Sequence, residues 1–161
     1  SVEITDEYYN QLLAGQSAGL LIAESKKGCP ILVVHEASIE EIRAQKLDEL
    51  RLFDSSEAVN QFSINGVLGW LNKSTRVGLM NSINIEKEAG RSETSIWIGD
   101  TKFVLSIERA IDILQQLELY ALACFNTTQR HTKAIQQLET KEEIKAYNYY
   151  VGYPGKLSFT G

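Results

Sequence analysis

The residues that could do chemistry are few and scattered in this chain of 161 residues. There are two histidines, His35 and His131, and two cysteines, Cys29 and Cys124. His35 is followed by Glu36, and such a pair could act as a general base and its orienting carboxylate, but adjacency in sequence does not build a site. The two cysteines are too far apart for a C-x-x-C motif. We therefore expect no catalytic residue, no bound metal and no cofactor.

Short motifs that carry a known mechanism lead to the same expectation. The sequence holds no phosphate-binding glycine loop, no H-E-x-x-H, no G-x-S-x-G and no calcium-binding loop. The acidic pairs Glu40-Glu41 and Glu142-Glu143 lie where the first turns of helices are predicted, and the helix dipole explains them there. A small enzyme or a ligand-binding module with an unrecognised site is the alternative.

The composition is that of an ordinary globular chain with an acidic balance. Hydrophobic residues make up 43% and charged residues 23% of the chain, and the formal net charge is −5. An acidic chain lacks the basic surface that a phosphate backbone requires, so we expect no nucleic-acid partner. No apolar run reaches the roughly 18 residues of a membrane-spanning helix, so we expect no membrane partner. The acidic, polar N-terminus predicts no secretory signal.

Residues 1–37 are predicted to form a small unit of one helix and one hairpin. Asp6 is a candidate cap for a short helix that stops at Gly15. Two apolar runs follow, residues 20–23 and 31–34, and a Ser-Lys-Lys-Gly turn separates them.

Residues 38–161 are predicted to form the main domain. It begins with a connector helix, after which one pattern of elements occurs twice. A strand, a turn containing glycine, a second strand, a polar cap and a helix occur in residues 62–85 and again in residues 96–119. The turns are Asn65-Gly66 and Gly99-Asp100, and the caps are Asn72 and Ser106. We expect an α+β fold, in which two ββα units form one small antiparallel sheet with a long helix.

The long helix is predicted over residues 107–138. Apolar or small residues recur along it at steps of three and four, without an interrupting glycine or proline. Further apolar residues widen this stripe in the first half, which we therefore expect in the core: Ile111, Ile113, Leu119, Tyr120, Leu122 and Phe125. The narrower second half is expected to contact another helix. A break near Asn126, giving two shorter helices, is the alternative.

Partner-binding residues are predicted on the second half of this helix and in the segment that follows it. Tyrosine is enriched in interfaces, although docking onto the parent domain also explains a cluster of tyrosines. The predicted set is Thr128, His131, Ile135, Leu138, Tyr147, Tyr149, Tyr150 and Tyr153. Because the helix outruns a small core, we expect a homo-oligomer joined partly through it. With His131 in that contact, the oligomer would loosen below roughly pH 6.

Two stretches resemble bacteriophage families. The segment ITDEYYNQLLAGQSAGLLIAESKKGCPILV resembles the N-terminal segment of tail-fibre assembly proteins, through its L-x-G-Q-x-x-G and G-x-P-x-L patterns. Cys29 departs from the polar residue more usual in that family. The region from about Lys46 to Tyr149 resembles a domain-of-unknown-function family that often follows this segment in phage and prophage proteins. It does so through INGVLGWLNKSTR, FVLSIERAIDILQQLELYA and ETKEEIKAY.

The resemblance implies a tail-fibre assembly role or a place in the tail, with a tail-fibre protein as partner, and it implies no catalytic residue. We therefore expect a non-enzymatic phage or prophage protein. Its expected location is the cytoplasm of the bacterial host during assembly, or the virion.

Overall fold

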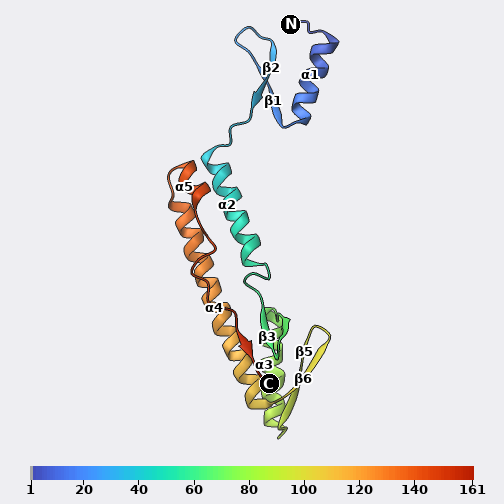
Figure 1. Cartoon of the computed structure of the whole chain (residues 1–161), viewed down its shortest axis with the longest axis vertical. Helices are drawn as coiled ribbons and strands as arrows, with labels where there is room; N and C mark the ends of the chain where they lie inside the picture. Colours follow the sequence, from blue (N-terminus) through green and yellow to red (C-terminus); the bar gives the residue numbers. More distant parts are fainter. Residues whose placement is uncertain (1) are drawn as a thin grey trace. The chain divides into compact units, whose positions relative to one another are not determined.

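The structure, a computed structural model, describes residues 2–161 (Figure 1). The described residues form five helices and seven short strands, which is the α+β fold that the sequence predicts. The chain divides into two compact units, residues up to 41 and residues 42–161. The boundary predicted from the sequence lies after residue 37. Each unit is described by itself.

The N-terminal unit consists of α1 (Asp6–Ser17) and an antiparallel hairpin of β1 (Leu20–Glu24) and β2 (Pro30–Val34). Thr5, and not Asp6 as predicted, caps α1, because its side chain accepts a hydrogen bond from the Tyr8 amide. The helix also continues past Gly15, where it was expected to stop. Gly15 lacks a side chain, and Leu32 of β2 packs directly into the space that a Cβ would fill.

The larger unit begins within α2 (Ile39–Asp54), and the Ser38 hydroxyl caps the start of this helix by accepting a hydrogen bond from the Glu41 amide. The two ββα units follow. The first comprises β3 (Phe62–Ile64), β4 (Val67–Gly69) and α3 (Lys73–Glu88), and the second comprises β5 (Glu93–Ile98), β6 (Thr101–Ser106) and α4 (Ile107–Gln137). These elements confirm the repeated pattern.

Local chemistry explains why the turns and helix starts lie where the sequence predicts them. Asn65 and Gly66 have φ values of 48° and 81°, the left-handed conformation that a tight hairpin turn requires. The side chain of Asn72 accepts from the Thr75 amide at 2.9 Å, and the Ser106 hydroxyl accepts from the Arg109 amide at 3.1 Å. Both predicted helix caps are confirmed.

The single antiparallel sheet is not formed, and this part of the prediction is wrong. The order β4-β3-β7 makes one sheet, and β5-β6 makes another. The two-residue strand β7 (Ser158–Phe159) pairs in parallel with β3 and so occupies its second edge. Ile98 of β5 fills the space beside Gly69 of β4, where a Cβ would otherwise stand. The two hairpins therefore meet through side-chain packing instead of sharing a hydrogen-bonded edge.

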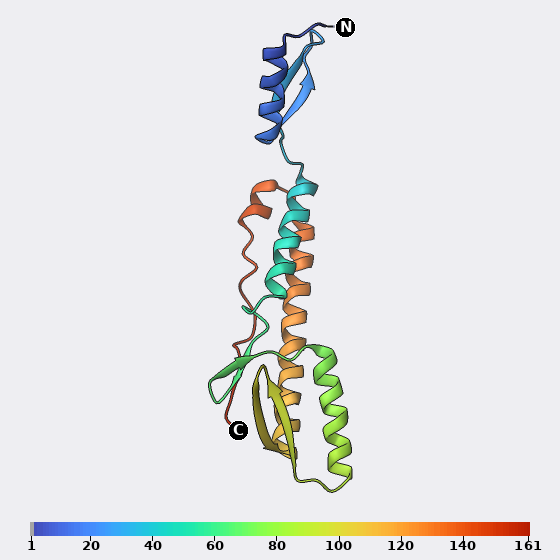
Figure 2. The same ribbon diagram turned by 90° about the vertical axis from the view of Figure 1, so that its right-hand side faces the viewer.

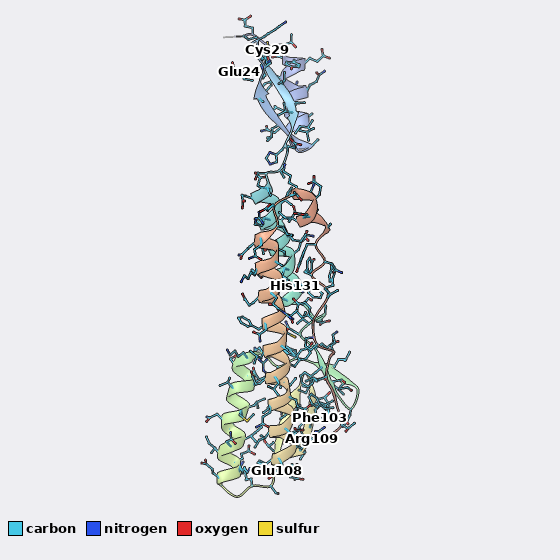
Figure 3. All side chains as sticks on the ribbon, turned by 90° about the vertical axis from the view of Figure 1, so that its left-hand side faces the viewer. Glu24, Cys29, Phe103, Glu108, Arg109 and His131 are labelled. Carbon is cyan, nitrogen blue, oxygen red and sulfur yellow. The ribbon has the colours of Figure 1, made fainter. Side chains whose placement is uncertain are left out.

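The main core lies between the two small sheets and the first half of α4. Among its fully buried side chains are Phe62, Ile64, Ile83, Ile98 and Leu114. Arg109 on α4 contacts the C-terminal residues that include the last strand, β7. Its guanidinium donates to the Thr160 carbonyl and lies over the Phe159 ring, 5.8 Å from the ring centroid (Figure 3).

α4 runs unbroken from Ile107 to Gln137, so the alternative of a break near Asn126 is wrong. Beyond the small sheets its second half lies beside α2, and the C-terminal segment runs back along both helices (Figures 1 and 2). That segment starts with α5 (Lys141–Ala146), where Thr140 and Glu143 form a capping box.

Candidate interaction surface

Thr128 and His131 point into the layer between α4, α2 and the C-terminal segment. The Thr128 hydroxyl lies 2.7 Å from both the Asp54 carboxylate and the Tyr153 hydroxyl. His131 is buried, with Nε2 2.7 Å from the Val151 carbonyl oxygen and Nδ1 2.6 Å from the Tyr147 hydroxyl (Figure 3). A carbonyl oxygen can only accept, so Nε2 donates to Val151, and the Tyr147 hydroxyl, which can donate or accept, pairs with Nδ1.

Ile135 and Leu138 are held against α2. The side chain of Ile135 is fully buried. The carbonyl oxygens of both residues accept hydrogen bonds from the guanidinium of Arg43, at 2.6 and 3.0 Å. α2 is therefore the helix that the second half of α4 was expected to contact, and it belongs to the same chain.

The C-terminal tyrosines form an aromatic cluster around Phe53 of α2. The rings of Tyr149, Tyr150 and Tyr153 lie 5.7, 4.9 and 5.4 Å from the Phe53 ring, centroid to centroid. The pKa of Tyr149 is raised to about 12. The larger cause is the hydrogen bond with the Tyr150 hydroxyl, and the next is burial of the Tyr149 side chain. Burial also raises the pKa of Tyr147. Tyr150 alone keeps a largely exposed side chain within the predicted set.

The predicted partner-binding residues thus make extensive contacts within the chain itself. The burial of His131 and Ile135 within the chain also bears on the predicted oligomer. A helix-to-helix contact between copies through the stripe that ends at Leu138 would require α2 and the C-terminal segment to move away first. Docking onto the parent domain, the alternative explanation for the tyrosines, describes what the structure shows.

The first half of α4 also differs from its prediction, because some of its residues that were expected in the core are exposed. Ile113 and Tyr120 are buried as expected, but Leu119, Leu122 and Phe125 are 67%, 55% and 57% exposed. Only one helix, α3, and two short hairpins pack against this stretch of α4. They cover less of the helix surface than its apolar residues occupy, so the remaining apolar side chains stay exposed. Three large apolar side chains within seven residues of one helix form a patch of the kind that marks interaction sites.

A groove between α3 and α4 adjoins this patch. Its central feature is Arg76, whose side chain is buried and whose Nε lies 2.6 Å from the Glu118 carboxylate. Arg76 also donates to the Leu71 carbonyl oxygen at 2.6 Å and lies over the Trp70 ring. On one side of the Arg76–Glu118 pair a hollow of about 340 Å³ leads along α3, and on the other a hollow of about 400 Å³ reaches Leu122 and Phe125.

We call these two hollows together the α3–α4 groove. Its α3 wall carries Val77 and Met80 and the amide side chains of Asn81 and Asn84. Neither amide makes a hydrogen bond within the described residues, and both are exposed. An amide offers donors and an acceptor together, so Asn81 and Asn84 can pair with the backbone of an incoming peptide segment. Apolar walls with a few orienting polar groups are typical of binding sites.

Sequence reasoning missed this groove because an amphipathic pattern shows which residues are apolar. It does not show how many of those residues are packed against other elements of the fold. One signal was available. From Ala110 to Phe125 the apolar residues point all around α4, which a helix covered on one side cannot bury. That excess is what Leu119, Leu122 and Phe125 expose.

Within residues 2–161, no three histidine, cysteine or carboxylate side chains gather as a metal site would require. In the same part of the chain, no helix combines the length and the apolar character needed to cross a membrane. Comparison of the chain with protein-family models, with curated proteins and with solved structures found no match.

Proposed function

We propose that this chain is a non-enzymatic phage or prophage protein that acts as a tail-fibre assembly factor or a tail-associated interaction protein. The observation that carries the proposal is the α3–α4 groove with its neighbouring patch of Leu119, Leu122 and Phe125. The resemblance of the N-terminal segment to tail-fibre assembly proteins supports the choice of partner. The place of action that fits this role is the cytoplasm of the bacterial host during assembly, or the virion.

The groove favours a particular kind of partner segment. Its walls offer apolar surface from Val77, Met80, Leu122 and Phe125. The Arg76–Glu118 ion pair between the two hollows carries no net charge, so it neither attracts nor repels a charged peptide strongly. The segment bound here is therefore an apolar stretch of a fibre protein, with its backbone paired to the amides on α3.

Such binding would assist assembly by covering apolar surface of a fibre subunit, so that this surface makes no contact with other chains before the fibre assembles. Chains that have not finished folding or assembling expose apolar surface, and such surface promotes aggregation while it is left uncovered. A small protein that holds such surface in a groove and is displaced by neighbouring fibre chains needs no chemistry.

The test is co-expression of the tagged chain with the tail-fibre protein of the phage or prophage that carries the gene. We expect the two proteins to purify together, and we expect Leu122→Asp to reduce the recovered fibre protein at least tenfold. A charge placed at the centre of an apolar contact would otherwise be buried without a partner.

The matched control is Leu52→Asp on α2. Leu52 is 56% exposed and also lies on a helix, but it lines neither hollow of the groove. Equal losses from both substitutions would show that the groove is not the binding site. Failure of the unaltered chain to retain the fibre protein would contradict the function itself.

A further inference from the structure

A hollow of about 640 Å³ lies between the second half of α4 and the C-terminal segment. Its α4 wall carries two cations, Arg130 and Lys133, and two amides, Asn126 and Gln129. Gly152 belongs to the opposite wall, in the C-terminal segment. Within the described part of the chain, no acidic side chain lines this hollow, and it shares no lining residue with the α3–α4 groove. We call it the cationic hollow.

The charge of the cationic hollow differs from that of the chain as a whole. The chain has 21 acidic residues against 16 basic ones. None of the acidic residues falls in residues 119–138 of α4 or in residues 144–161, the two stretches that supply the walls (Figures 1 and 2). Two positive side chains between walls without acidic groups create a local positive potential, although the net charge of the chain is negative.

Both cations keep most of their hydrogen-bonding capacity for a ligand. Arg130 donates one hydrogen bond of 3.0 Å, to the Thr127 hydroxyl, whereas a guanidinium has five N–H donors. Among the residues that the structure describes, neither Arg130 nor Lys133 makes an ion pair, and Lys133 makes no hydrogen bond. Both side chains are exposed. A carboxylate that enters the hollow therefore meets donors that no other group uses.

Buried groups hold the wall beside Arg130 in place. The Thr127 side chain is 3% exposed, and its hydroxyl lies 3.2 Å from the Gly152 carbonyl oxygen as well as 3.0 Å from the Arg130 guanidinium. Gly152 has a φ of 87°, a left-handed conformation that glycine adopts readily. His131 holds the neighbouring Val151 carbonyl at 2.7 Å. Arg130 is thus oriented before a ligand arrives, which lowers the entropy cost of binding.

We propose that the cationic hollow binds an acidic peptide segment of a partner protein, with carboxylates of that segment paired to Arg130 and Lys133. A guanidinium matches a carboxylate through two parallel hydrogen bonds. The amides of Asn126 and Gln129 can pair with the backbone of the bound segment. Ala123, which also lines the hollow, can contact the carbon atoms of an acidic side chain.

Charge and spacing favour a peptide over a phosphate polymer. A net charge of −5 repels a long polyanion, whereas a few carboxylates on a short segment interact mainly with the charges closest to them. Arg130 and Lys133 are three positions apart, about 4.5 Å along the helix axis. Side chains on one face of an extended peptide repeat every 6.8 Å or so, roughly, and long flexible side chains bridge this difference. Glutamate at alternate positions therefore fits the two cations.

The probe is a short fluorescein-labelled peptide in which glutamate alternates with alanine, and fluorescence anisotropy with the full chain measures its dissociation constant. A peptide of the same length with glutamine in place of glutamate is the uncharged control, and we expect it to bind more weakly. Binding of the glutamate peptide should weaken as the salt concentration rises, because its charges are screened.

Two substitutions on α4 test the cations separately. Lys133→Gln should raise the dissociation constant about fivefold, and this loss would not arise from misfolding because Lys133 makes no hydrogen bond or ion pair in the described structure. Arg130→Gln should raise it about tenfold or more, because a bidentate pair is lost. The matched control is Lys87→Gln. Lys87 is exposed on α3 and lines neither the cationic hollow nor the α3–α4 groove, so we expect unchanged affinity.

Nuclear magnetic resonance of the isotope-labelled chain locates the bound peptide. The amide signals of Thr127 and Gly152 should shift on titration, and that of Asn81 in the α3–α4 groove should not. Because the inference does not depend on the fibre-binding role, Leu122→Asp should leave the affinity for the glutamate peptide unchanged.

Several results would overturn the proposal. They are absence of binding at millimolar protein, equal binding of the glutamine peptide, and equal affinities of Lys133→Gln and Lys87→Gln for the glutamate peptide. An oligothymidylate of equal charge tests the phosphate alternative, and tighter binding of this oligonucleotide than of the glutamate peptide would also overturn it.

Discussion

Arg43 on α2 donates a hydrogen bond of 2.6 Å to the carbonyl oxygen of Ile135, in the last turns of α4. The last carbonyls of a helix have no partner within the helix, and a cation is stabilising beside them. The final residues of α4, from Ala134 to Gln137, include no basic side chain. α2 therefore supplies the positive charge that α4 lacks at its own end.

Replacing this arginine should weaken the larger unit. Arg43→Met removes the donor and leaves the Ile135 and Leu138 carbonyl oxygens without it, so we expect the free energy of unfolding to fall by about 1–3 kcal/mol. Urea denaturation of the full chain measures the change. Arg51→Met on the same helix is the control, because Arg51 makes an exposed ion pair with Asp48 and should matter by no more than about 0.5 kcal/mol.

The second prediction concerns the attachment of the C-terminal segment. His131→Ala should destabilise the protein by about 2–3 kcal/mol, because it leaves the Val151 carbonyl and the Tyr147 hydroxyl without their partner. It should also speed hydrogen exchange in residues 147–153 more than in β5 and β6. Lys133→Ala, an exposed change on the same helix, should alter neither quantity. Uniform acceleration across the unit would argue that His131 does not hold this segment in particular.

The third prediction is an alkaline limit set by the tyrosines. The pKa of Tyr149 is raised to about 12 in the folded protein, against an ordinary value near 10 in the unfolded chain. The folded state therefore keeps a proton that the unfolded state releases. This contribution to stability is fully present below pH 10 and is lost as the pH rises from 10 to 12.

We expect the free energy of unfolding to fall over that range, and to fall less steeply in Tyr149→Phe, which has no proton to lose. Denaturant titrations at several pH values give the slopes. Tyr9→Phe, at an exposed position on α1, is the control. An unchanged slope in Tyr149→Phe would show that the hydroxyl does not contribute to the alkaline loss.

Two glycines should respond to alanine with opposite signs. Gly66→Ala forces a side chain into the left-handed conformation of the β3–β4 turn and should cost about 1 kcal/mol. Gly78 lies in the middle of α3 with open space around it, so Gly78→Ala should stabilise the helix by about 0.5–1 kcal/mol. Thermal unfolding compares the two variants directly, and a loss of stability in Gly78→Ala would mean that this part of α3 has a neighbour.

Local signals predicted the elements well, because each depends on a few adjacent residues. The positive φ of Asn65 and Gly66 and the cap at Asn72 are properties of short segments, and so the hairpins and helix starts followed from the sequence. The parallel pairing of β7 with β3 could not be predicted in this way. It joins two short segments far apart in the chain, and a two-residue strand has no pattern of its own.

The candidate site shows the same limit. That α4 is long and apolar was evident from its spacing, but which face would be covered depended on where α2 and the C-terminal segment pack. His131 and Ile135 were expected to meet a partner and are instead buried by their own chain. Leu122 and Phe125 were expected in the core and are instead exposed. Periodicity identifies an apolar face of a helix, whereas the elements that pack against that face are decided by the tertiary fold.

The parallel pairing of β3 with β7 also has a consequence for the order of folding. Ser63 and Ser158, whose hydroxyls lie 3.0 Å apart in this pairing, are 95 positions apart along the chain. Bringing such distant segments together costs about 4 kcal/mol in loop-closure entropy, before any contact is gained. The two hairpins and the α3–α4 packing close much shorter loops and should form first. Shortening the Phe159 side chain should therefore speed unfolding and leave the refolding rate almost unchanged.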